Sequence, residues 1–389
     1  MGPAMSMRTG PLARAILVLA AGLSLGAPHP ASGADKPVRK VKVDVGQIAG
    51  ARFAIANPPG DWNHRLLLIV HGYRPESAPL VADLNPDRAS NRALLDEGWM
   101  VATTSFRRNG IVIAEAIADL DALRKFIAEE YGDPERTLLE GESLGGLIVA
   151  IMAERETGPY DGAVVFDATL YAKETNGQVG LSLLPRIPLL FVATLREAAQ
   201  SKGYLTALVA RPPPVVPPAL FLISREGHDN INQPERLFAL RALNAWVERG
   251  PDALPHPRDQ ARYFDATIEP DPGPSTALPH AGGRGFDSRV AEVDAVYGNV
   301  LLEAQAKDFA DAGIPPMTYC TVSAGGRAYR ALYGRTYSDV KNGEWVAFPD
   351  ADGRTVLSRV LANAAGTASL KAGDPVSLDP VEPGGTPLP

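Results

Sequence analysis

Cysteine is almost absent from this sequence, because Cys320 is the only one among 389 residues. A single cysteine cannot form a disulfide within the chain, so packing alone must hold the fold together. An excess of positive charge is lacking too: 38 basic residues stand against 45 acidic ones, for a formal net charge of −7. Scattered, mildly acidic charge excludes the basic patch that nucleic-acid binding requires. We therefore expect no nucleic-acid partner.

Long hydrophobic runs are missing except near the N-terminus. Arg8 and Arg14 precede an apolar run over 15–25, and small residues follow over 31–34. This order of charged, apolar and small residues is typical of a secretory signal. The run is about a dozen residues long, which is too short to span a bilayer with ease. We expect residues 1–34 to be a cleaved signal peptide and the protein to be periplasmic or secreted, without a stable membrane anchor.

The rest of the chain is long enough for two domains. From 35 to 250, continuous apolar stretches alternate with stretches of helical spacing. Strands that are apolar along their whole length are buried on both faces, so this alternation predicts a largely parallel sheet covered by helices on both sides. The expected strands are 38–48, 51–56, 66–70, 99–105, 137–140, 162–166, 188–193 and 219–223, and the expected helices are 91–98, 112–131, 144–156 and 234–249.

The composition changes after residue 250. Residues 251–286 are rich in proline and glycine, which predicts a linker. From 287 to 378, short alternating stretches are separated by glycine, asparagine and aspartate turns, a pattern that predicts a small β-rich domain. The last segment, 379–389, is again rich in proline and glycine and is expected to be a disordered tail.

A G-x-S-x-G motif, Gly141-Glu142-Ser143-Leu144-Gly145, lies between an apolar strand and a helix. A nucleophile on a sharp strand-to-helix turn needs a strained backbone. Side chains two residues to either side would collide, and the two glycines remove them. The N-terminus of the following helix also favours developing negative charge. Ser143 is therefore the predicted nucleophile.

A serine nucleophile needs a general base, and His228 is the candidate. It follows the last predicted strand and precedes the closing helix, which fits the chain order serine, acid, histidine. The other histidines lie in the signal, beside the strand at 66–70 or in the linker: His29, His64, His71, His256 and His280. Elimination therefore leaves His228 as the predicted base.

The acid of the triad has two candidates between Ser143 and His228. It must orient the imidazole and stabilise its charged form. Glu197 follows the strand at 188–193, and Asp167 follows the strand at 162–166. Both positions suit such a fold; Glu197 is the favoured assignment and Asp167 the alternative.

An oxyanion hole needs two backbone N–H groups aimed at the developing negative oxygen. The residue after the nucleophile supplies one of them, so Leu144 is the first predicted donor. The loop after the strand at 66–70 supplies the other, and Tyr73 is the predicted donor there.

Three segments, LLLIVHGY, GESLGG and GHDNINQPERLFALRALNAWVERG, in this order resemble an α/β-hydrolase over about residues 40–250. The resemblance implies a mostly parallel eight-stranded sheet and acyl transfer to water through a seryl ester. It implies neither a metal nor an organic cofactor. We expect a serine hydrolase acting on small-molecule or polymer-derived carboxylic esters. A peptidase or acyltransferase with the same triad, or a non-catalytic binding or assembly module, are the alternatives.

The second half of the chain carries further separated motifs, at 293–299, 336–340, 342–344, 352–353, 363–365 and 370–374. In this order they resemble the C-terminal β-barrel of the SAM hydroxide adenosyltransferases. In that family the barrel helps to hold SAM, partly through an aromatic-Gly-Asn segment, and Tyr297-Gly298-Asn299 stands at the corresponding place. The barrel here follows a hydrolase-like region, so we expect an accessory or assembly module, including assembly into a homo-oligomer. A nucleoside-like ligand site is the alternative.

Overall fold

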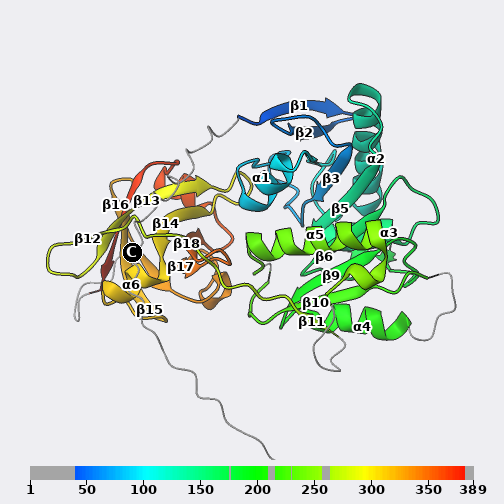
Figure 1. Ribbon diagram of the computed structural model, residues 1–389. Helices are drawn as coiled ribbons and strands as arrows, with labels where there is room; N and C mark the ends of the chain where they lie inside the picture. Colours follow the sequence, from blue (N-terminus) through cyan, green and yellow to red (C-terminus); the bar gives the residue numbers. More distant parts are fainter. Residues whose placement is uncertain (1–39, 175–176, 209–214, 229, 256–262, 382–389) are drawn as a thin grey trace, which may run out of the picture. The chain divides into compact units, whose positions relative to one another are not determined.

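The computed structural model describes residues 40–174, 177–208, 215–228, 230–255 and 263–381 (Figure 1). The predicted signal peptide, residues 1–34, lies outside this part of the chain, as do residues 382–389 of the predicted tail. Residues Lys40–Pro389 belong to one compact unit.

Nine strands of the first domain build one large sheet. They are β1 (Lys42–Ile48), β2 (Ala51–Asn57), β3 (Arg65–Val70), β4 (Met100–Thr104), β5 (Arg136–Glu142), β6 (Gly162–Phe166), β9 (Leu189–Thr194), β10 (Ala219–Ile223) and β11 (Phe264–Asp265). Across the sheet their order is β1-β2-β4-β3-β5-β6-β9-β10-β11. β2 is antiparallel to both of its neighbours, and all the other pairings are parallel.

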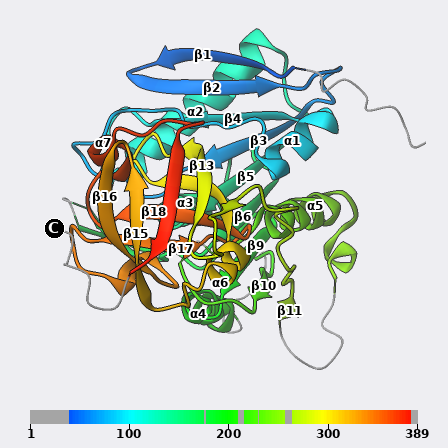
Figure 2. The same cartoon turned by 90° about the vertical axis from the view of Figure 1, so that its left-hand side faces the viewer.

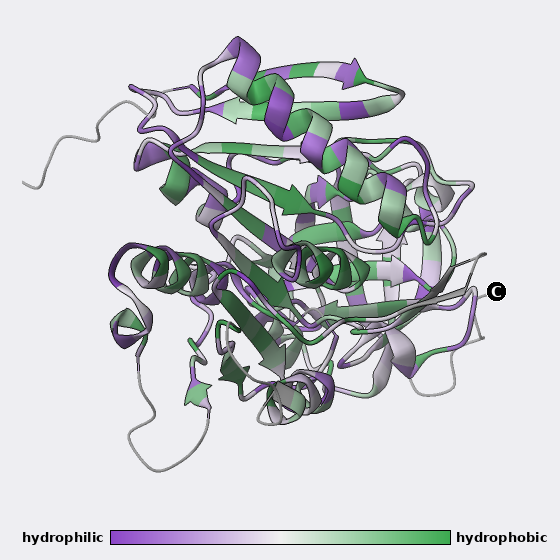
Figure 3. Cartoon of the chain, turned by 90° about the vertical axis from the view of Figure 1, so that its right-hand side faces the viewer, coloured by the Kyte–Doolittle hydropathy of each residue, from purple (hydrophilic) through white to green (hydrophobic). Residues whose placement is uncertain are grey.

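Helices cover both faces of this sheet. They are α1 (Ala89–Asp96), α2 (Ile113–Glu130), α3 (Leu144–Ala153), α4 (Ala198–Leu208) and α5 (Gln233–Arg249). Successive strand residues point to opposite faces. Leu66 and Leu68 of β3 accordingly pack into a core with α2 and α3, whereas Leu67 packs into a core with α1 and α5. Burial on both faces explains why the central strands are hydrophobic along their length (Figure 3).

This architecture confirms the predicted fold class, an α/β-hydrolase fold with a mostly parallel sheet. Eight longer strands are present, as expected, and β11 adds a ninth strand of two residues. β11 pairs with β10, so part of the stretch predicted as a linker is built into the sheet. Its two residues are too few to show a strand pattern in the sequence. The hairpin of β7 (Ala172–Glu174) and β8 (Gly177–Val179) escaped prediction for the same reason.

The remaining strands form a second, smaller domain. They are β12 (Leu278–Pro279), β13 (Phe286–Val293), β14 (Val300–Gln305), β15 (Thr318–Ala324), β16 (Arg327–Tyr333), β17 (Trp345–Pro349), β18 (Arg354–Arg359) and β19 (Pro375–Pro380). Their order is β12-β13-β14-β18-β17-β16-β15-β19, and β19 also pairs with β13. Seven strands therefore close into a barrel, to which β12 is attached (Figure 2).

The barrel has its own hydrophobic core, which includes the stacked rings of Phe309 and Tyr333. Two short helices, α6 (Ala306–Asp311) and α7 (Ala364–Ala368), contribute buried residues to it. Cys320 is buried in the same core, and burial raises the pKa of its thiol to about 12. The barrel confirms the predicted small β-barrel domain. β19 ends at Pro380, two residues inside the segment expected to be a tail.

Candidate active site

Ser143 lies on the turn between β5 and α3. Its backbone has φ 52° and ψ −119°, a conformation that residues other than glycine rarely adopt. The surrounding structure holds this turn, because the Ser143 N–H donates to the Phe166 carbonyl at 3.0 Å. The Ser143 carbonyl in turn accepts from the Leu147 N–H at 3.3 Å, at the start of α3. A strained serine is therefore fixed between the central strand and a helix N-terminus.

The two glycines of the motif permit a close approach of backbone segments. A Cβ atom added to Gly145 would collide with the carbonyl oxygens of Val70 and His71. A Cβ atom added to Gly141 would collide with the carbonyl of Gly145 itself. The obstacles are backbone atoms of β3, of the residue after it and of α3, so they cannot move aside as a flexible side chain would.

Gly145→Ala is expected to lower the free energy of unfolding by about 2–4 kcal/mol, because the new methyl group overpacks a rigid backbone contact. Gly203→Ala is the matched control. Gly203 lies in α4, where an added Cβ meets nothing within 4 Å. There, alanine should raise stability by about 0.5–1 kcal/mol through its higher helix propensity. Urea unfolding of both variants measures the two changes. A Gly145→Ala protein as stable as the wild type would contradict the close approach.

The structure brings together three residues singled out in the sequence. His228 Nε2 lies 3.1 Å from the Oγ atom of Ser143. His228 Nδ1 lies 3.5 Å from Oε1 of Glu197, which follows β9. The side chain of Glu197 is 17% exposed and that of His228 is 45% exposed, so the carboxylate is the more enclosed partner. One imidazole thus faces a serine on one side and a carboxylate on the other.

Asp167, the alternative acid, makes different contacts. It is buried at the end of β6, with a positive φ of 37°. Its Oδ1 accepts the Thr194 N–H at 2.7 Å and lies 3.1 Å from the Thr194 hydroxyl. That hydroxyl also lies 2.7 Å from the carbonyl oxygen of Gly227, the residue before His228. Through Thr194, Asp167 is therefore connected to the base of the histidine loop.

The segments that carry the predicted oxyanion donors lie next to Ser143. Leu144 is the first residue of α3, and the first N–H groups of a helix have no partner within it. Gly72 packs against the turn: a Cβ atom added there would lie 3.3 Å from the Ser143 Cβ. Tyr73 is the next residue, and it is exposed.

His71 supports the same loop from within. Its Nδ1 lies 2.7 Å from the Gly72 carbonyl oxygen, and its ring is 4.1 Å from that of Phe106. Burial, with the positive charge of Arg74 beside it, lowers the pKa of His71 to about 4. The imidazole is therefore neutral at pH 7, and its Nδ1–H donates to Gly72. These contacts make His71 a structural part of the loop.

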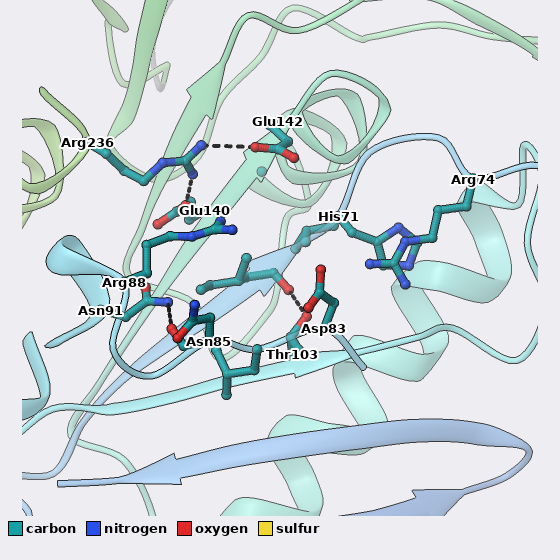
Figure 4. Close-up of a pocket in the computed structure, with 14 residues that line it drawn as sticks. His71, Arg74, Asp83, Asn85, Arg88, Asn91, Thr103, Glu140, Glu142 and Arg236 are labelled. Atoms are coloured by element: carbon teal, nitrogen blue, oxygen red, sulfur yellow. Dashed lines mark hydrogen bonds and ion pairs between the residues drawn. The ribbon is translucent and has the colours of Figure 1, made fainter. Parts of the chain in front are cut away.

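Glu140, Glu142 and Arg236 form a charge cluster at the end of β5, in which Glu140 is buried and the side chain of Glu142 is 41% exposed (Figure 4). Arg236, on α5, forms ion pairs with both carboxylates, and the Glu142 pair measures 2.9 Å. Partial desolvation would raise the pKa of Glu142, but Arg236 and Arg88 more than offset it and hold this pKa below its usual value. Glu142 precedes Ser143, so the cluster anchors the entry to the turn.

The charge cluster borders a cavity of about 80 Å³, also lined by His71, Arg74 and Asp83 (Figure 4). A polar cavity of this size has room for several water molecules. The sequence does not predict this cavity. The only signal was an acidic residue, Glu140, at the end of the apolar stretch TLLE, since a buried charge requires a partner.

Among the described residues, no group of three or more His, Cys, Asp or Glu side chains could hold a metal ion. In the same part of the chain, no helix is long and apolar enough to cross a membrane.

The strand order, the turn at Ser143 and the histidine after the last long strand define the class of the first domain, which has the α/β-hydrolase fold. The second domain is matched by sequence: residues 288–377 match the family of the SAM hydroxide adenosyltransferase C-terminal domain. This match confirms the resemblance of the barrel and covers less than a quarter of the 389 residues. No curated protein sequence matches the chain.

Several solved structures are similar to parts of the chain. An uncharacterized conserved protein from Thermotoga maritima is 21% identical over 31% of this chain and 45% of its own, with a TM-score of 0.25. The acylaminoacyl peptidase of Pyrococcus horikoshii is 12% identical over 57% of this chain and 43% of its own, with a TM-score of 0.39. A Pyrobaculum calidifontis esterase is 15% identical over 48% of this chain and 77% of its own, with a TM-score of 0.36. The chain thus spans less than half the length of the first two, and the fold assignment rests on the sheet and the turn at Ser143.

Proposed function

We propose that this protein is a serine hydrolase that cleaves carboxylic esters through a seryl-acyl intermediate. The observation that carries the proposal is the 3.1 Å separation of His228 Nε2 from Ser143 Oγ, on a strained turn at a helix N-terminus. A general base within hydrogen-bond reach is what a serine hydroxyl needs to become a nucleophile.

In this proposal Ser143 Oγ attacks the acyl carbon while its proton passes to His228 Nε2. Glu197 orients the imidazole through Nδ1 and stabilises the imidazolium that forms. The backbone N–H groups of Leu144 and Tyr73 hold the oxyanion. His228 returns the proton to the leaving alcohol, then takes one from water as the water attacks the acyl-serine. The carboxylic acid leaves, and Ser143 regains its proton from His228.

The proposed substrates are small-molecule or polymer-derived esters, and the proposed site of action is the periplasm or the medium. The location is supported by the charged, apolar and small-residue order of residues 1–34. An ester is the favoured acyl donor because an alcohol leaves more readily than an amine. Turnover of p-nitrophenyl acetate without turnover of p-nitroacetanilide would support this choice over a peptidase.

A fluorophosphonate probe is expected to label the native full-length protein once per chain. Such probes phosphonylate a serine only when a base activates it, so the adduct should map to the peptide that contains Ser143. Peptide mass spectrometry locates the adduct, and protein unfolded before exposure to the probe serves as the control. Absence of an adduct, or an adduct on another serine, would refute the proposed function.

A further inference from the structure

The turn between β13 and β14 presents a tyrosine from the barrel. Oδ1 of Asp294 accepts the N–H groups of Val296 at 2.6 Å and Tyr297 at 2.7 Å, which closes the turn. Gly298 follows with φ +72°, and an added Cβ there would collide with Asn363. The barrel therefore holds Tyr297 in a fixed position, although the residue is 43% exposed.

The hydroxyl of Tyr297 reaches the hydrolase domain. It donates a hydrogen bond to the carbonyl oxygen of Tyr73. Tyr73 is the residue whose N–H is proposed to hold the oxyanion, and Gly72 before it packs against Ser143. Arg74 after it is buried, and its carbonyl accepts the Gly110 N–H at 2.9 Å. Tyr73 thus lies between two residues that the hydrolase domain holds in place. The barrel, through Tyr297, supplies the hydrogen bond to the carbonyl of Tyr73.

Two more hydrogen bonds join the same domains. Oδ1 of Asp352, in the turn between β17 and β18, accepts the backbone N–H of Gln233 at 2.8 Å. Gln233 is the first residue of α5, five residues after His228. On the other side, Oε2 of Glu292 accepts from Nδ2 of Asn85 at 3.4 Å. The barrel therefore contacts the chain segments that follow both the oxyanion loop and the histidine loop.

We propose that Tyr297 is a positioning residue that keeps the oxyanion loop in its reactive conformation, so that the barrel completes the active site. The inference rests on the proposed serine-hydrolase function. An oxyanion donor acts only when its N–H is preorganised, and the bond to the Tyr73 carbonyl restricts rotation of the residue that carries the N–H. The bond should therefore matter more in the transition state than in the substrate complex.

Tyr297→Phe, which removes only the hydroxyl, is expected to lower kcat for p-nitrophenyl acetate by about 3- to 10-fold, the range of one net hydrogen bond. KM should stay within about twofold, because the ground-state ester makes little use of the donor. The rate of fluorophosphonate labelling should fall by the same factor as kcat. Tyr337→Phe, at an exposed tyrosine of the same barrel, is the matched control and should leave all three values unchanged.

A second pair of variants acts on the turn instead of the hydroxyl. Asp294→Ala removes the acceptor of two N–H groups and should reproduce the loss of kcat, whereas Asp294→Asn keeps an Oδ1 acceptor and should retain most of it. Unchanged kcat in Tyr297→Phe, or a change confined to KM, would overturn the inference while Ser143-dependent turnover upholds the hydrolase. A wild-type protein without Ser143-dependent turnover would overturn both.

Discussion

Ser143→Ala is expected to lower kcat for p-nitrophenyl acetate by about 10⁴- to 10⁶-fold and to abolish fluorophosphonate labelling. The reason is that no covalent intermediate can form, and only the oxyanion donors and substrate binding remain to favour reaction with water. The fold should be unaffected, because the serine hydroxyl bonds to a half-exposed histidine outside the core. The free energy of unfolding is expected to change by less than about 1 kcal/mol.

The kinetic comparison needs equal purity of both proteins, because a trace of another esterase would be mistaken for residual activity of Ser143→Ala. Ser338→Ala is the control variant, since Ser338 is an exposed serine of the barrel and its hydroxyl lies 3.3 Å from that of Thr336. It should retain full activity. If Ser143→Ala kept more than about 1% of the wild-type kcat, the hydrolysis would have to proceed without the nucleophile, contrary to the mechanism.

Most of the fold could be predicted because the burial of a strand or helix determines the pattern of its apolar residues. Strands such as β3 are packed on both faces, so they are apolar along their length, and the predicted bounds of the parallel strands from β3 to β10 differ from the observed ones by at most two residues. The turn at Ser143 was predictable for a different reason. Its backbone strain and close packing require glycines at fixed positions, and those are visible as a motif.

Contacts between segments far apart in the sequence produce no local pattern that could predict them. Tyr297 and Tyr73 are 224 residues apart, and their bond joins a hydroxyl to a backbone carbonyl, which any residue could provide. The sequence singled out Tyr297 through the resemblance of the barrel, for which an accessory or assembly module was expected and a nucleoside-like ligand site was the alternative. In the structure its hydroxyl donates to a carbonyl of the hydrolase domain. A local pattern can identify a residue as unusual without identifying the partner, since the partner is fixed only by the fold.

The family match of the barrel and its contacts with the hydrolase domain are compatible. By sequence, residues 288–377 match a domain family defined in adenosyltransferases. By structure, its turns at Tyr297 and Asp352 are bonded to segments beside the nucleophile and the histidine. A domain can keep its core and closure while its loops take on new contacts, because function is carried by sites placed on folds. In this protein two loops of the barrel form hydrogen bonds to the hydrolase domain, and our proposal gives one of them a role in positioning the oxyanion loop.

The acid of the triad is the last member to assign, and two near-isosteric variants separate the candidates. Glu197→Gln is expected to lower kcat by about 10²- to 10⁴-fold, because a neutral amide cannot stabilise the imidazolium of His228. Asp167→Asn is expected to lower kcat by less than about 10-fold, because the amide oxygen can still accept the Thr194 N–H and hold the histidine loop.

The effect of losing a negative charge near His228 must be distinguished from the effect of losing the contact with its Nδ1. Glu226 provides a control for the loss of charge. It is an exposed carboxylate two residues before His228, so Glu226→Gln removes the same charge from the same loop. Its kcat should stay within about twofold of the wild type, because exposed charges are screened by solvent. Thermal unfolding of all three variants checks that each is folded. If Asp167→Asn lost more activity than Glu197→Gln, the 3.5 Å contact between Glu197 and His228 Nδ1 would not be the catalytic one, and Asp167 would be the acid. We expect kcat to be far lower in Glu197→Gln than in the other two variants, Asp167→Asn and Glu226→Gln. That result would make Glu197 the partner of the base and Asp167 a residue that supports the loop.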